Sequence, residues 1–493
     1  MPHPLVYEIN TRCWLRRLSE ARGRPMDLGG VADSEIERWQ NLGFTHIWLM
    51  GVWTTGPRCR AMALREPNLR NARAKLLPQG GDHDIGASPY AISAYEVPHA
   101  LGGEAGLKKF RERLNARGLK LILDFVPNHV GLDHPWIRER PHLFVHSASE
   151  APETFRHPDP SHALWIAHGK DPHFPAWNDT AQLDYRAAET HATMLETLRS
   201  VAALCDGVRC DMSMLLLPEV FAKTWEHLPR GAATHPADFW PTAIQTIKSA
   251  RPNFAFVAEV YWGLEERLQR LGFDATYNKH LYDTLIYRHH NAAQRHLVER
   301  PAAFLNASLH FLENHDEPRI LSLLSPAEAR ASALLLLGLP GWRLLFQGQL
   351  DGARLRAPVQ LNRYPPEPPQ PEIANFYDRL LSRLPKTAVG QGEAQVLTPT
   401  PAAPGDASAE SVILVQWRLP SGRVDLVVVN LAPTKAQCYA PLNFPGLADR
   451  DWQLTDLLSR ETVQRRGAEL RKPGLYLDLP PHAAQLLHFE PAR

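Results

Sequence analysis

The stretch CDGVRCDMS, residues 205–213, decides how the chain is interpreted. Val208 and Cys210 are apolar and alternate with Arg209 and Asp211, a pattern that predicts a short strand ending in a carboxylate. Because Arg209 lies two positions before Asp211, both side chains point to the same side of that strand. A guanidinium beside a carboxylate favours the ionised form that a nucleophilic aspartate requires. Taken alone, the pair fits an ordinary ion pair at a strand end better than a catalytic pair. The rest of the sequence decides between these two interpretations.

Short apolar runs alternate with amphipathic helical patterns on both sides of this stretch, up to about residue 384. The run at 121–126 is almost wholly apolar, as in a strand covered on both faces. Eight strands are predicted in all, over residues 5–9, 45–50, 121–126, 207–211, 254–259, 273–277, 308–312 and 342–346. Because helical patterns follow most of them, the sequence predicts an α/β fold, a (β/α)8 TIM barrel with its reactive groups on the loops after the strands.

Two segments depart from this alternation. Residues 131–185 are rich in His, Pro, Asp and aromatic residues and are too long for a connecting loop, so an inserted subdomain is predicted after the third strand. Alternating apolar runs beyond residue 390 predict an antiparallel β-sandwich over 391–493. The barrel is assigned to residues 1–130 and 186–390. The proline-rich piece YPPEPPQP, residues 364–371, is interpreted as a stiff surface connection, with a polyproline ligand for a partner domain as the alternative.

The composition limits the kinds of partner that the protein is expected to bind. The chain has 493 residues, 44% hydrophobic and 22% charged, with a formal net charge of +1, so neither nucleic acid nor a membrane surface is an expected partner. A neutral, polar partner fits better. The N-terminus lacks the pattern of a secretory signal, and the five scattered cysteines fit free thiols, so a cytoplasmic location is expected. A mature secreted form and the oligomeric state stay open.

Carboxylates and histidines recur where the predicted strands end. The third strand ends in DFVPNH, residues 124–129, and the fifth in FAFVAEVYW, residues 254–262, which contains Glu259. The seventh ends in LHFLENHDEP, residues 309–318, which contains His315 and Asp316. In a barrel these ends converge on one rim. Glycosidic cleavage needs two carboxylates flanking the bond, and a third nearby can hold sugar hydroxyls as positive charge develops.

Four of these stretches, DFVPNH, GVRCD, AEVYW and FLENHD, resemble in order the four signature regions of the α-amylase family of retaining glycoside hydrolases. QLDY at residues 182–185 is similar to the family's additional motif at the end of its inserted domain. SPYAISAY at residues 88–95 resembles the segment that supplies a stacking tyrosine. The resemblance covers about residues 5–390, and the C-terminal β domain also fits the family's architecture.

The resemblance implies a catalytic role for three carboxylates. Asp211 would be the nucleophile that forms a covalent β-glycosyl intermediate. Glu259 would be the general acid and then the general base, and Asp316 the transition-state stabiliser. Arg209 would hold Asp211 ionised, and like-charge repulsion would raise the pKa of Glu259.

Further residues are assigned to substrate binding or to structure. By the same resemblance, His129 and His315 would bind hydroxyls of the sugar under attack, and Tyr90 would stack on its ring. Asp124 is expected to hold the loop that carries His129. Trp262 is expected either to line the leaving-group side or to pack in the core. Three aromatic residues of the insert are interpreted as packing that subdomain, with a sugar platform as the alternative; they are Trp165, Phe174 and Trp177.

Asn128 and Asp184 match positions that ligate calcium in many members of the family. Carboxylate and amide oxygens suit that hard cation. However, many intracellular members do without calcium. No cofactor is therefore assigned, and calcium stays an alternative.

One departure from the family pattern bears on the substrate. Many starch-degrading members have Lys and His three and four residues after the nucleophile, where this chain has Met214 and Leu215. The Lys usually contacts the leaving-group sugar, so its absence favours a different acceptor side. The leading hypothesis is a retaining hydrolase of α-1,4-linked glucans or maltooligosaccharides. The alternatives are a transglycosylase, either a glucanotransferase or a disaccharide-forming or isomerising enzyme, and a non-catalytic glucan-binding protein.

Overall fold

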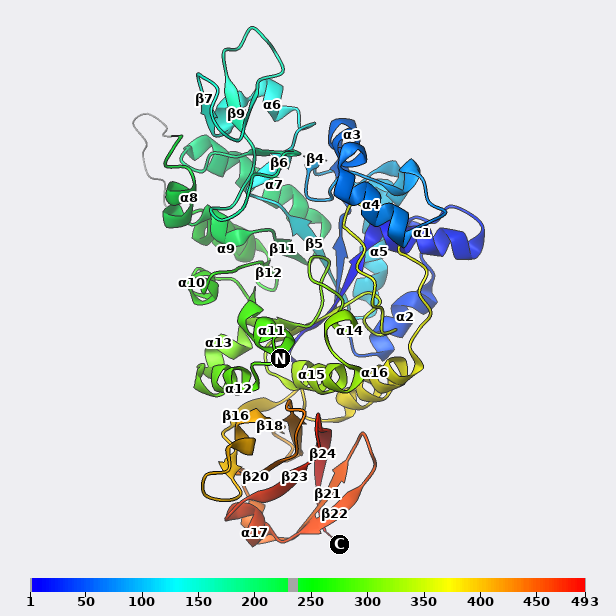
Figure 1. Cartoon of the computed structure of the whole chain (residues 1–493), viewed down its shortest axis with the longest axis vertical. Helices are drawn as coiled ribbons and strands as arrows, with labels where there is room; N and C mark the ends of the chain where they lie inside the picture. The colour runs from blue at the N-terminus through cyan, green and yellow to red at the C-terminus, as the bar shows by residue number, and fades with distance from the viewer. Residues whose placement is uncertain (1, 229–237, 493) are drawn as a thin grey trace.

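A closed barrel of eight parallel strands forms the centre of the molecule (Figure 1). The computed structural model describes residues 2–228 and 238–492. Around the barrel the strands follow one another in chain order, and the last pairs with the first. They are β1 (Leu5–Asn10), β2 (His46–Met50), β5 (Lys120–Phe125), β11 (Gly207–Cys210), β12 (Ala255–Ala258), β13 (Ala275–Tyr277), β14 (Ser308–Phe311) and β15 (Trp342–Phe346). Each coincides with a predicted strand, so the (β/α)8 prediction is confirmed.

Helices surround the barrel and connect its strands. In α5 the buried residues are Leu107, Phe110 and Leu114, at the helical spacing that the sequence shows. The helix cannot simply continue past Gly118, whose φ of +75° is left-handed. The helices outside the insert are α1 (Thr11–Arg22), α2 (Asp33–Asn41), α3 (Pro57–Arg65), α4 (Pro67–Leu76), α5 (Gly103–Ala116), α7 (Ala188–Leu204), α8 (Pro218–Thr224), α9 (Phe239–Ala250), α10 (Glu265–Arg270), α11 (Lys279–Ile286), α12 (His290–Glu299), α13 (Ala302–Asn306), α14 (Ile320–Leu323), α15 (Pro326–Gly338) and α16 (Pro371–Arg383).

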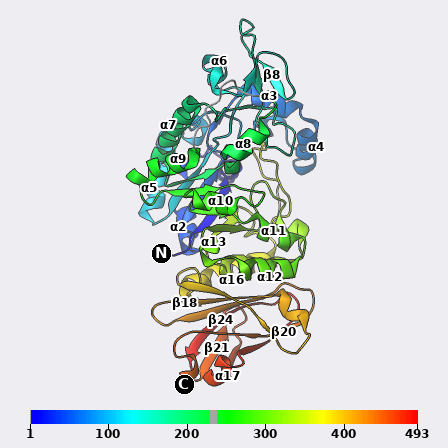
Figure 2. The same ribbon diagram turned by 90° about the vertical axis from the view of Figure 1, so that its left-hand side faces the viewer.

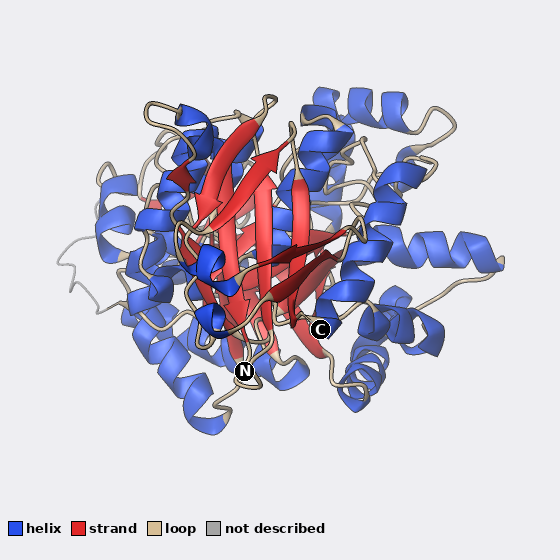
Figure 3. Cartoon of the chain, turned by 90° about the horizontal axis from the view of Figure 1, so that it is seen from below, coloured by secondary structure: helices blue, strands red, loops and turns tan. Residues whose placement is uncertain are grey.

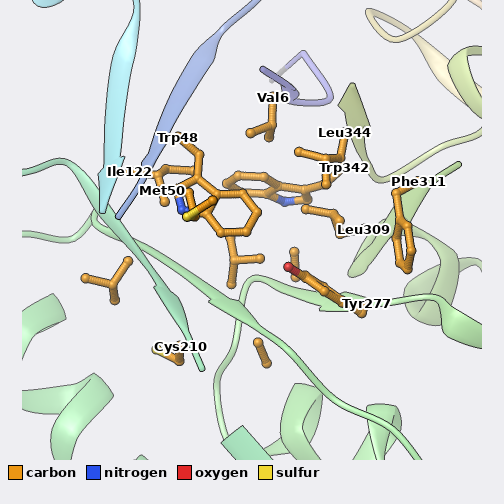
Figure 4. Packing of buried hydrophobic residues seen from close by; sticks show 14 of the residues in the cluster. Val6, Trp48, Met50, Ile122, Cys210, Tyr277, Leu309, Phe311, Trp342 and Leu344 are labelled. Carbon is orange, nitrogen blue, oxygen red and sulfur yellow. The ribbon is translucent and has the colours of Figure 1, made fainter. Parts of the chain in front are cut away.

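Large side chains fill the barrel. Trp48 of β2 and Trp342 of β15 lie near the middle of the group drawn in Figure 4, and Val6, Leu309 and Leu344 lie around Trp342. All five are buried. Close packing of this kind makes the barrel a rigid support for the side chains at its rim.

Two excursions leave the barrel on the carboxyl side of the strands. The predicted insert carries two small antiparallel sheets, and Figures 1 and 2 place it at the end of the molecule opposite the C-terminal domain. Its elements are β6 (His129–Gly131), α6 (Trp136–Glu139), β7 (His146–Ser147), β8 (Thr154–Arg156), β9 (Trp165–Ala167) and β10 (Thr180–Gln182). Residues 51–102 form a second excursion that the sequence did not predict; it holds α3, α4, β3 (Thr54–Thr55) and β4 (Ile92–Ala94).

The C-terminal part is an antiparallel two-sheet domain, as predicted (Figure 3). The larger sheet has the order β16-β18-β19-β24-β21-β22, and the smaller one β17-β20-β23. The elements are β16 (Glu393–Leu397), β17 (Thr400–Pro401), β18 (Val412–Arg418), β19 (Val424–Asn430), β20 (Ala436–Ala440), β21 (Trp452–Asp456), β22 (Thr462–Arg465), α17 (Gly467–Arg471), β23 (Leu475–Leu479) and β24 (Ala484–Pro491). The exact domain boundaries stay a prediction.

The larger C-terminal sheet is apolar on both faces. Val415 and Val427 belong to the main core that includes the barrel, whereas Leu414 and Leu426 belong to the core between the two sheets. The alternation of side chains along a strand produces this division. Gly338, the last residue of α15, lies so close to the sheet that a Cβ there would be 2.7 Å from Cγ1 of Val427. The domain is therefore packed directly on the helices of the barrel.

Three further observations concern the cysteines, the helices as membrane spans and the proline-rich piece. All five cysteines are buried and free. Among the helices of residues 2–228 and 238–492, none is long and apolar enough to cross a membrane. The proline-rich piece at residues 364–370 precedes α16 without regular secondary structure, as a connection would.

Candidate active site

A cavity of about 620 Å³ opens at the carboxyl ends of the barrel strands. Five of the seven predicted catalytic and substrate-binding residues line it: Tyr90, His129, Asp211, Glu259 and Asp316. The other two, Arg209 and His315, lie behind this surface and contact residues that line it. The structure therefore brings all seven together from loops that are far apart in the sequence.

Arg209 is the centre of the site. Its Nη1 donates a 2.7 Å hydrogen bond to Oδ1 of Asp211, and its Nη2 lies 2.7 Å from Oε2 of Glu259. The guanidinium also lies 5.3 Å from the ring centre of Tyr90, and its Nε donates to the hydroxyl of Tyr277. Arg209 is only 1% exposed. One buried cation thus holds two carboxylates in fixed positions.

Burial raises the pKa of Asp211 above its ordinary value, and the contact with Arg209 works against that rise. Arg209 itself stays charged because Glu259 and Asp211, among other groups, outweigh the cost of its burial and raise its pKa. The predicted influence of Arg209 on Asp211 is therefore present, but it opposes a burial effect that the sequence did not indicate.

Glu259 has a pKa of about 7. Burial is the largest cause, and the nearby charges of Asp211 and Asp316 raise the pKa further, while Arg209 lowers it. The sequence indicated repulsion between the carboxylates; the structure adds burial as the larger effect. A carboxyl group with this pKa is protonated in a substantial fraction of molecules near neutrality, as a general acid must be.

Two groups that the sequence did not single out fix the carboxyl group of Glu259. The hydroxyl of Tyr261 donates to Oε1 at 2.8 Å, and the backbone N–H of Met212 donates to Oε2 at 2.7 Å. Met212 has a φ of +41°, an unusual conformation for a residue other than glycine. This local backbone conformation, directly after Asp211, aims the N–H at Glu259. The spacing of Tyr261, two residues after Glu259 at a strand end, is a signal that could have indicated it.

Asp316 forms a chain of contacts with His315 and Glu8. Nε2 of His315 lies 2.9 Å from Oδ2 of Asp316, and Nδ1 lies 2.5 Å from Oε1 of Glu8. Burial alone would lower the pKa of His315, but the two carboxylates raise it to about 10. Although burial works in the other direction, the His315 imidazolium lowers the pKa of Asp316 to about 2. Asp316 is therefore ionised at neutral pH.

Glu8 was missed because its strand reads as simply apolar. A lone carboxylate within the run LVYEIN, residues 5–10, is the signal that could have found it.

The predicted sugar-binding side chains are arranged around this core. The ring of Tyr90 stacks on that of His315, 5.2 Å between centres, and its hydroxyl lies 2.6 Å from Nε2 of His315. His129 packs against Trp177 at 5.0 Å between ring centres, and burial lowers its pKa to about 4, which makes it neutral at pH 7. For His315 to bind a sugar hydroxyl through Nε2, it must exchange its contact with Asp316 or Tyr90. These binding roles stay predictions.

Asp124 was expected to hold the loop that carries His129, but the hydrogen bonds of its carboxylate go instead to residues at the end of β2. Its carboxylate accepts hydrogen bonds from Nε1 of Trp48 at 3.1 Å and from the backbone N–H of Gly51 at 3.0 Å. Burial raises its pKa to about 6. Asp124 therefore joins the rim ends of β2 and β5 below the cavity.

The predictions for the aromatic residues have different outcomes. Trp262 lines the cavity and is 41% exposed, so core packing is the wrong interpretation of this residue. Phe174, 66% exposed, and Trp177 also line the cavity, whereas Trp165 lies in β9 of the insert. Packing within the insert is therefore the wrong interpretation of Phe174, which instead provides an aromatic surface at the cavity.

Met214 and Leu215 are buried, at 0% and 2% exposure, in the turn that follows Asp211. Their side chains form part of the main core. A lysine at the cavity comes instead from the start of α11. Lys279 lines the cavity and pairs with Asp283 at 2.5 Å and with Glu317 at 3.3 Å.

The two residues considered for calcium have protein partners. Asn128 exchanges side-chain hydrogen bonds with Gln182, at 3.1 Å and 3.0 Å. Asp184 forms a two-pronged pair with Arg186, from Nε to Oδ1 at 2.8 Å and from Nη2 to Oδ2 at 3.0 Å. A guanidinium against this carboxylate repels a divalent cation, so the arrangement does not fit a calcium site that uses both residues.

Comparisons with known proteins agree with the fold. The family model for the α-amylase catalytic domain matches residues 19–354. The chain is 24% identical over 368 residues to the α-amylase MalA of Haloarcula japonica, covering 71% of this chain and 44% of that protein. It is 21% identical over 393 residues to α-amylase 3 of Dictyoglomus thermophilum, covering 73% and 66%. The match thus spans about half to two thirds of these relatives.

Solved structures show the same fold over nearly the whole chain. The maltogenic α-amylase AmyB of Thermotoga neapolitana superposes with a TM-score of 0.67 at 19% identity, covering 99% of each chain. Eubacterium rectale Amy13B gives a TM-score of 0.68 at 13% identity, covering 99% of this chain and 95% of that one. With the family model covering residues 19–354, these findings show that the chain belongs to the α-amylase family of enzymes acting on O-glycosidic bonds.

Proposed function

We propose that the protein is a retaining α-glucoside hydrolase that cleaves α-1,4-linked glucans or maltooligosaccharides. The observation that carries the proposal is the pair Asp211 and Glu259 on one guanidinium, with the pKa of Glu259 raised to about 7. Retaining enzymes hold their two carboxyl groups about 5–5.5 Å apart, whereas inverting enzymes need about 6.5–9.5 Å for a water molecule. Two carboxylates that share one arginine favour the shorter separation.

The geometry supports a double displacement. Asp211, in contact with Arg209, attacks the anomeric carbon and forms a glycosyl ester as the glycosidic C–O bond breaks. Glu259 gives its proton to the departing oxygen. It then takes a proton from water, which attacks the same carbon and releases Asp211. Each carboxyl group ends the cycle in the state in which it began.

Asp316 stabilises the positive charge that develops on the sugar ring. Its low pKa, held by His315, keeps it ionised throughout the cycle. We propose that Glu8 fixes this arrangement from below, because it holds the opposite nitrogen of the His315 ring. His129 and Tyr90 line the same cavity, which supports the proposal that they contact the attacked sugar.

We further propose that folding does not require calcium at Asn128 and Asp184. Arg186 supplies the positive charge beside Asp184, and its Nη1 also donates to the carbonyl oxygen of Leu228 at 2.7 Å. Arg186 thus pairs with Asp184 at the end of the insert and joins this segment to the chain after α8 through its hydrogen bond to Leu228. Arginine suits this position because its planar fork matches both oxygens of the carboxylate.

Transfer to a second sugar is the alternative. The exposed rings of Trp262 and Phe174 at the cavity favour it, since an aromatic surface binds an incoming sugar face. A maltosyltransferase of Pseudomonas aeruginosa is 24% identical over 197 residues, which cover 38% of this chain and 25% of that protein. Whether water or a sugar attacks the intermediate decides between the two reactions.

Product analysis tests the proposal. Maltotriose and a nitrophenyl α-glucoside are incubated with the protein, and the products are separated by chain length while proton NMR follows the first anomer formed. Glucose and maltose alone from maltotriose, and α-glucose as the first anomer formed from the nitrophenyl α-glucoside, are the expected result. Products longer than maltotriose would establish transfer. A β-anomer formed first, or no turnover of any α-glucan, would overturn the proposal.

A further inference from the structure

A second cavity, of about 640 Å³, lies on the same rim as the catalytic cavity but has different walls. It lies between α1, the loops after β14 and β15, and the proline-rich piece that the sequence analysis singled out. Its volume is within the roughly 300–1,000 Å³ of small-molecule sites. No residue that lines one of the two cavities also lines the other.

Polar atoms without protein partners gather at this second cavity. In the part of the chain that the structure describes, Oε1 of Gln347, Nε of Arg319 and the hydroxyl of Tyr364 are buried and have no hydrogen-bond partner. Nε of Arg363 also lacks a hydrogen bond, but it lies 3.4 Å from Oδ1 of Asp84. Gln347 is 2% exposed and Arg319 3% exposed, and all four residues line the cavity. A buried polar atom that is left without a hydrogen bond destabilises the folded state, so these atoms need a partner that the protein does not supply.

The unpartnered atoms define the chemistry of that partner. Gln347 offers an acceptor and Arg319 a donor, while the hydroxyl of Tyr364 can do both. Vicinal hydroxyl groups satisfy such a set, because each gives one proton and accepts another. An anion would satisfy the donors and leave the acceptor of Gln347 unpaired.

The charges around the cavity also favour a neutral ligand. The guanidinium of Arg319 is paired with Glu313 at 2.8 Å, and Arg363 lies 3.1 Å from Glu20. The charged residues that line the cavity balance as a set, the arginines Arg17, Arg319 and Arg363 against the carboxylates Glu20, Asp351 and Glu367. The carboxylate of Glu367 already accepts from two backbone N–H groups, those of Arg354 and Leu355.

Apolar surface completes the site. Leu77, Leu355, Pro365 and Pro366 line the cavity together with Tyr364. A pyranose has apolar C–H faces and a polar edge, so it matches walls that combine prolines and a tyrosine with isolated hydrogen-bonding atoms. The fixed φ of proline holds this wall in place without a ligand.

We propose that the second cavity binds glucosyl units of an α-glucan at a site apart from the catalytic cavity. The identity of the sugar rests on the proposed function; the preference for a neutral, hydroxyl-rich ligand rests on the cavity itself. Glu8 stands between the two sites. It holds His315 on one side and acts electrostatically on Arg319 and Tyr364 on the other.

The test uses the full chain carrying Glu259→Gln, so that maltotriose is bound without turnover. Isothermal titration with maltotriose is expected to show two binding events. Tyr364→Phe removes a hydroxyl that has no protein partner, and should weaken one event about three- to tenfold while leaving the other. Tyr287→Phe is the matched control, because Tyr287 is 65% exposed and lines neither cavity. Trp177→Ala should weaken the other event.

The outcomes separate this inference from the proposed function. A single event that responds to Trp177→Ala and not to Tyr364→Phe overturns the second site and leaves the proposed function intact. A single event that responds to Tyr364→Phe, with no turnover of maltotriose by the unmodified protein, supports the second site and overturns the proposed function. No binding at all overturns both. A crystal soaked in maltotriose should show the sugar against Gln347.

Discussion

The hydroxyl of Tyr261 donates a 2.8 Å hydrogen bond to Oε1 of Glu259, the carboxyl oxygen that Met212 does not hold. In the proposed mechanism this oxygen faces the substrate, so the hydroxyl of Tyr261 lies where the mechanism brings the glycosidic oxygen. A donor at this point favours the ionised form of Glu259 and so limits the rise in its pKa.

Tyr261→Phe should therefore raise the pKa of Glu259 from about 7. The proton donor must be protonated, so activity falls as the pH rises through this pKa, and the alkaline limb of the kcat/KM profile should move upward by about half a unit to one unit. The profile is measured with a nitrophenyl α-glucoside and with Tyr287→Phe as the control. An alkaline limb that stays in place would show that the hydroxyl only fills space.

Glu259→Gln should lower the turnover of maltotriose about 100- to 10,000-fold, because the amide cannot give or take the proton. The folded state should persist, since the amide keeps the shape of the carboxyl group. Glu265→Gln is the matched control: Glu265 begins α10, six residues further along, and lies outside the lining of the catalytic cavity. Near-normal turnover by the Glu259 variant would remove that residue from its assigned role.

Arg186→Ala should destabilise the protein by about 3–5 kcal/mol, because it leaves the carboxylate of Asp184 buried without its guanidinium partner. Urea unfolding followed by circular dichroism measures the loss. The unmodified protein should unfold at the same urea concentration with EDTA or with calcium. A strong stabilisation of the unmodified protein by calcium would contradict the proposed role of Arg186.

Trp262→Ala should affect the sugar on the leaving or accepting side more than the chemistry. We expect KM for maltotriose to rise about three- to tenfold with little change in the hydrolysis of activated nitrophenyl α-glucoside. Any transfer products should decline in the same variant. Tyr476→Ala is a suitable control, because this aromatic residue of the C-terminal domain is similarly exposed, 43% against 41%. An equal effect on both substrates would contradict a role of Trp262 in binding the sugar on the leaving or accepting side.

Sequence patterns predicted the strands and helices whose formation depends on the local sequence. Every barrel strand could be found because its apolar run and the helix that follows are continuous in the sequence. Asp211, Glu259 and Asp316 could be found because each follows such a run. The helices α3 and α4 were missed, although proline stands at the first position of each, because their apolar periodicity is weak.

What the sequence could not show depends on contacts between distant residues. Glu8 meets His315 across 307 positions, and Arg209 reaches Glu259 from the neighbouring strand. Burial, the largest cause of the raised pKa of Glu259, is a property of the assembled rim and not of any motif. The pairing of Asp184 with Arg186 could have been predicted, because the two residues are two positions apart. The family resemblance instead indicated calcium at Asp184.

The larger C-terminal sheet has a core on each face, and the indole of Trp417 donates a 2.7 Å hydrogen bond to the carbonyl oxygen of Gly338 at the end of α15. A chain shortened at residue 390 would lose one wall of its main core and leave α15 with an open apolar side. The sheet is thus a layer of the enzyme and not a detachable module. Cooperative unfolding of barrel and sheet together follows from this shared core.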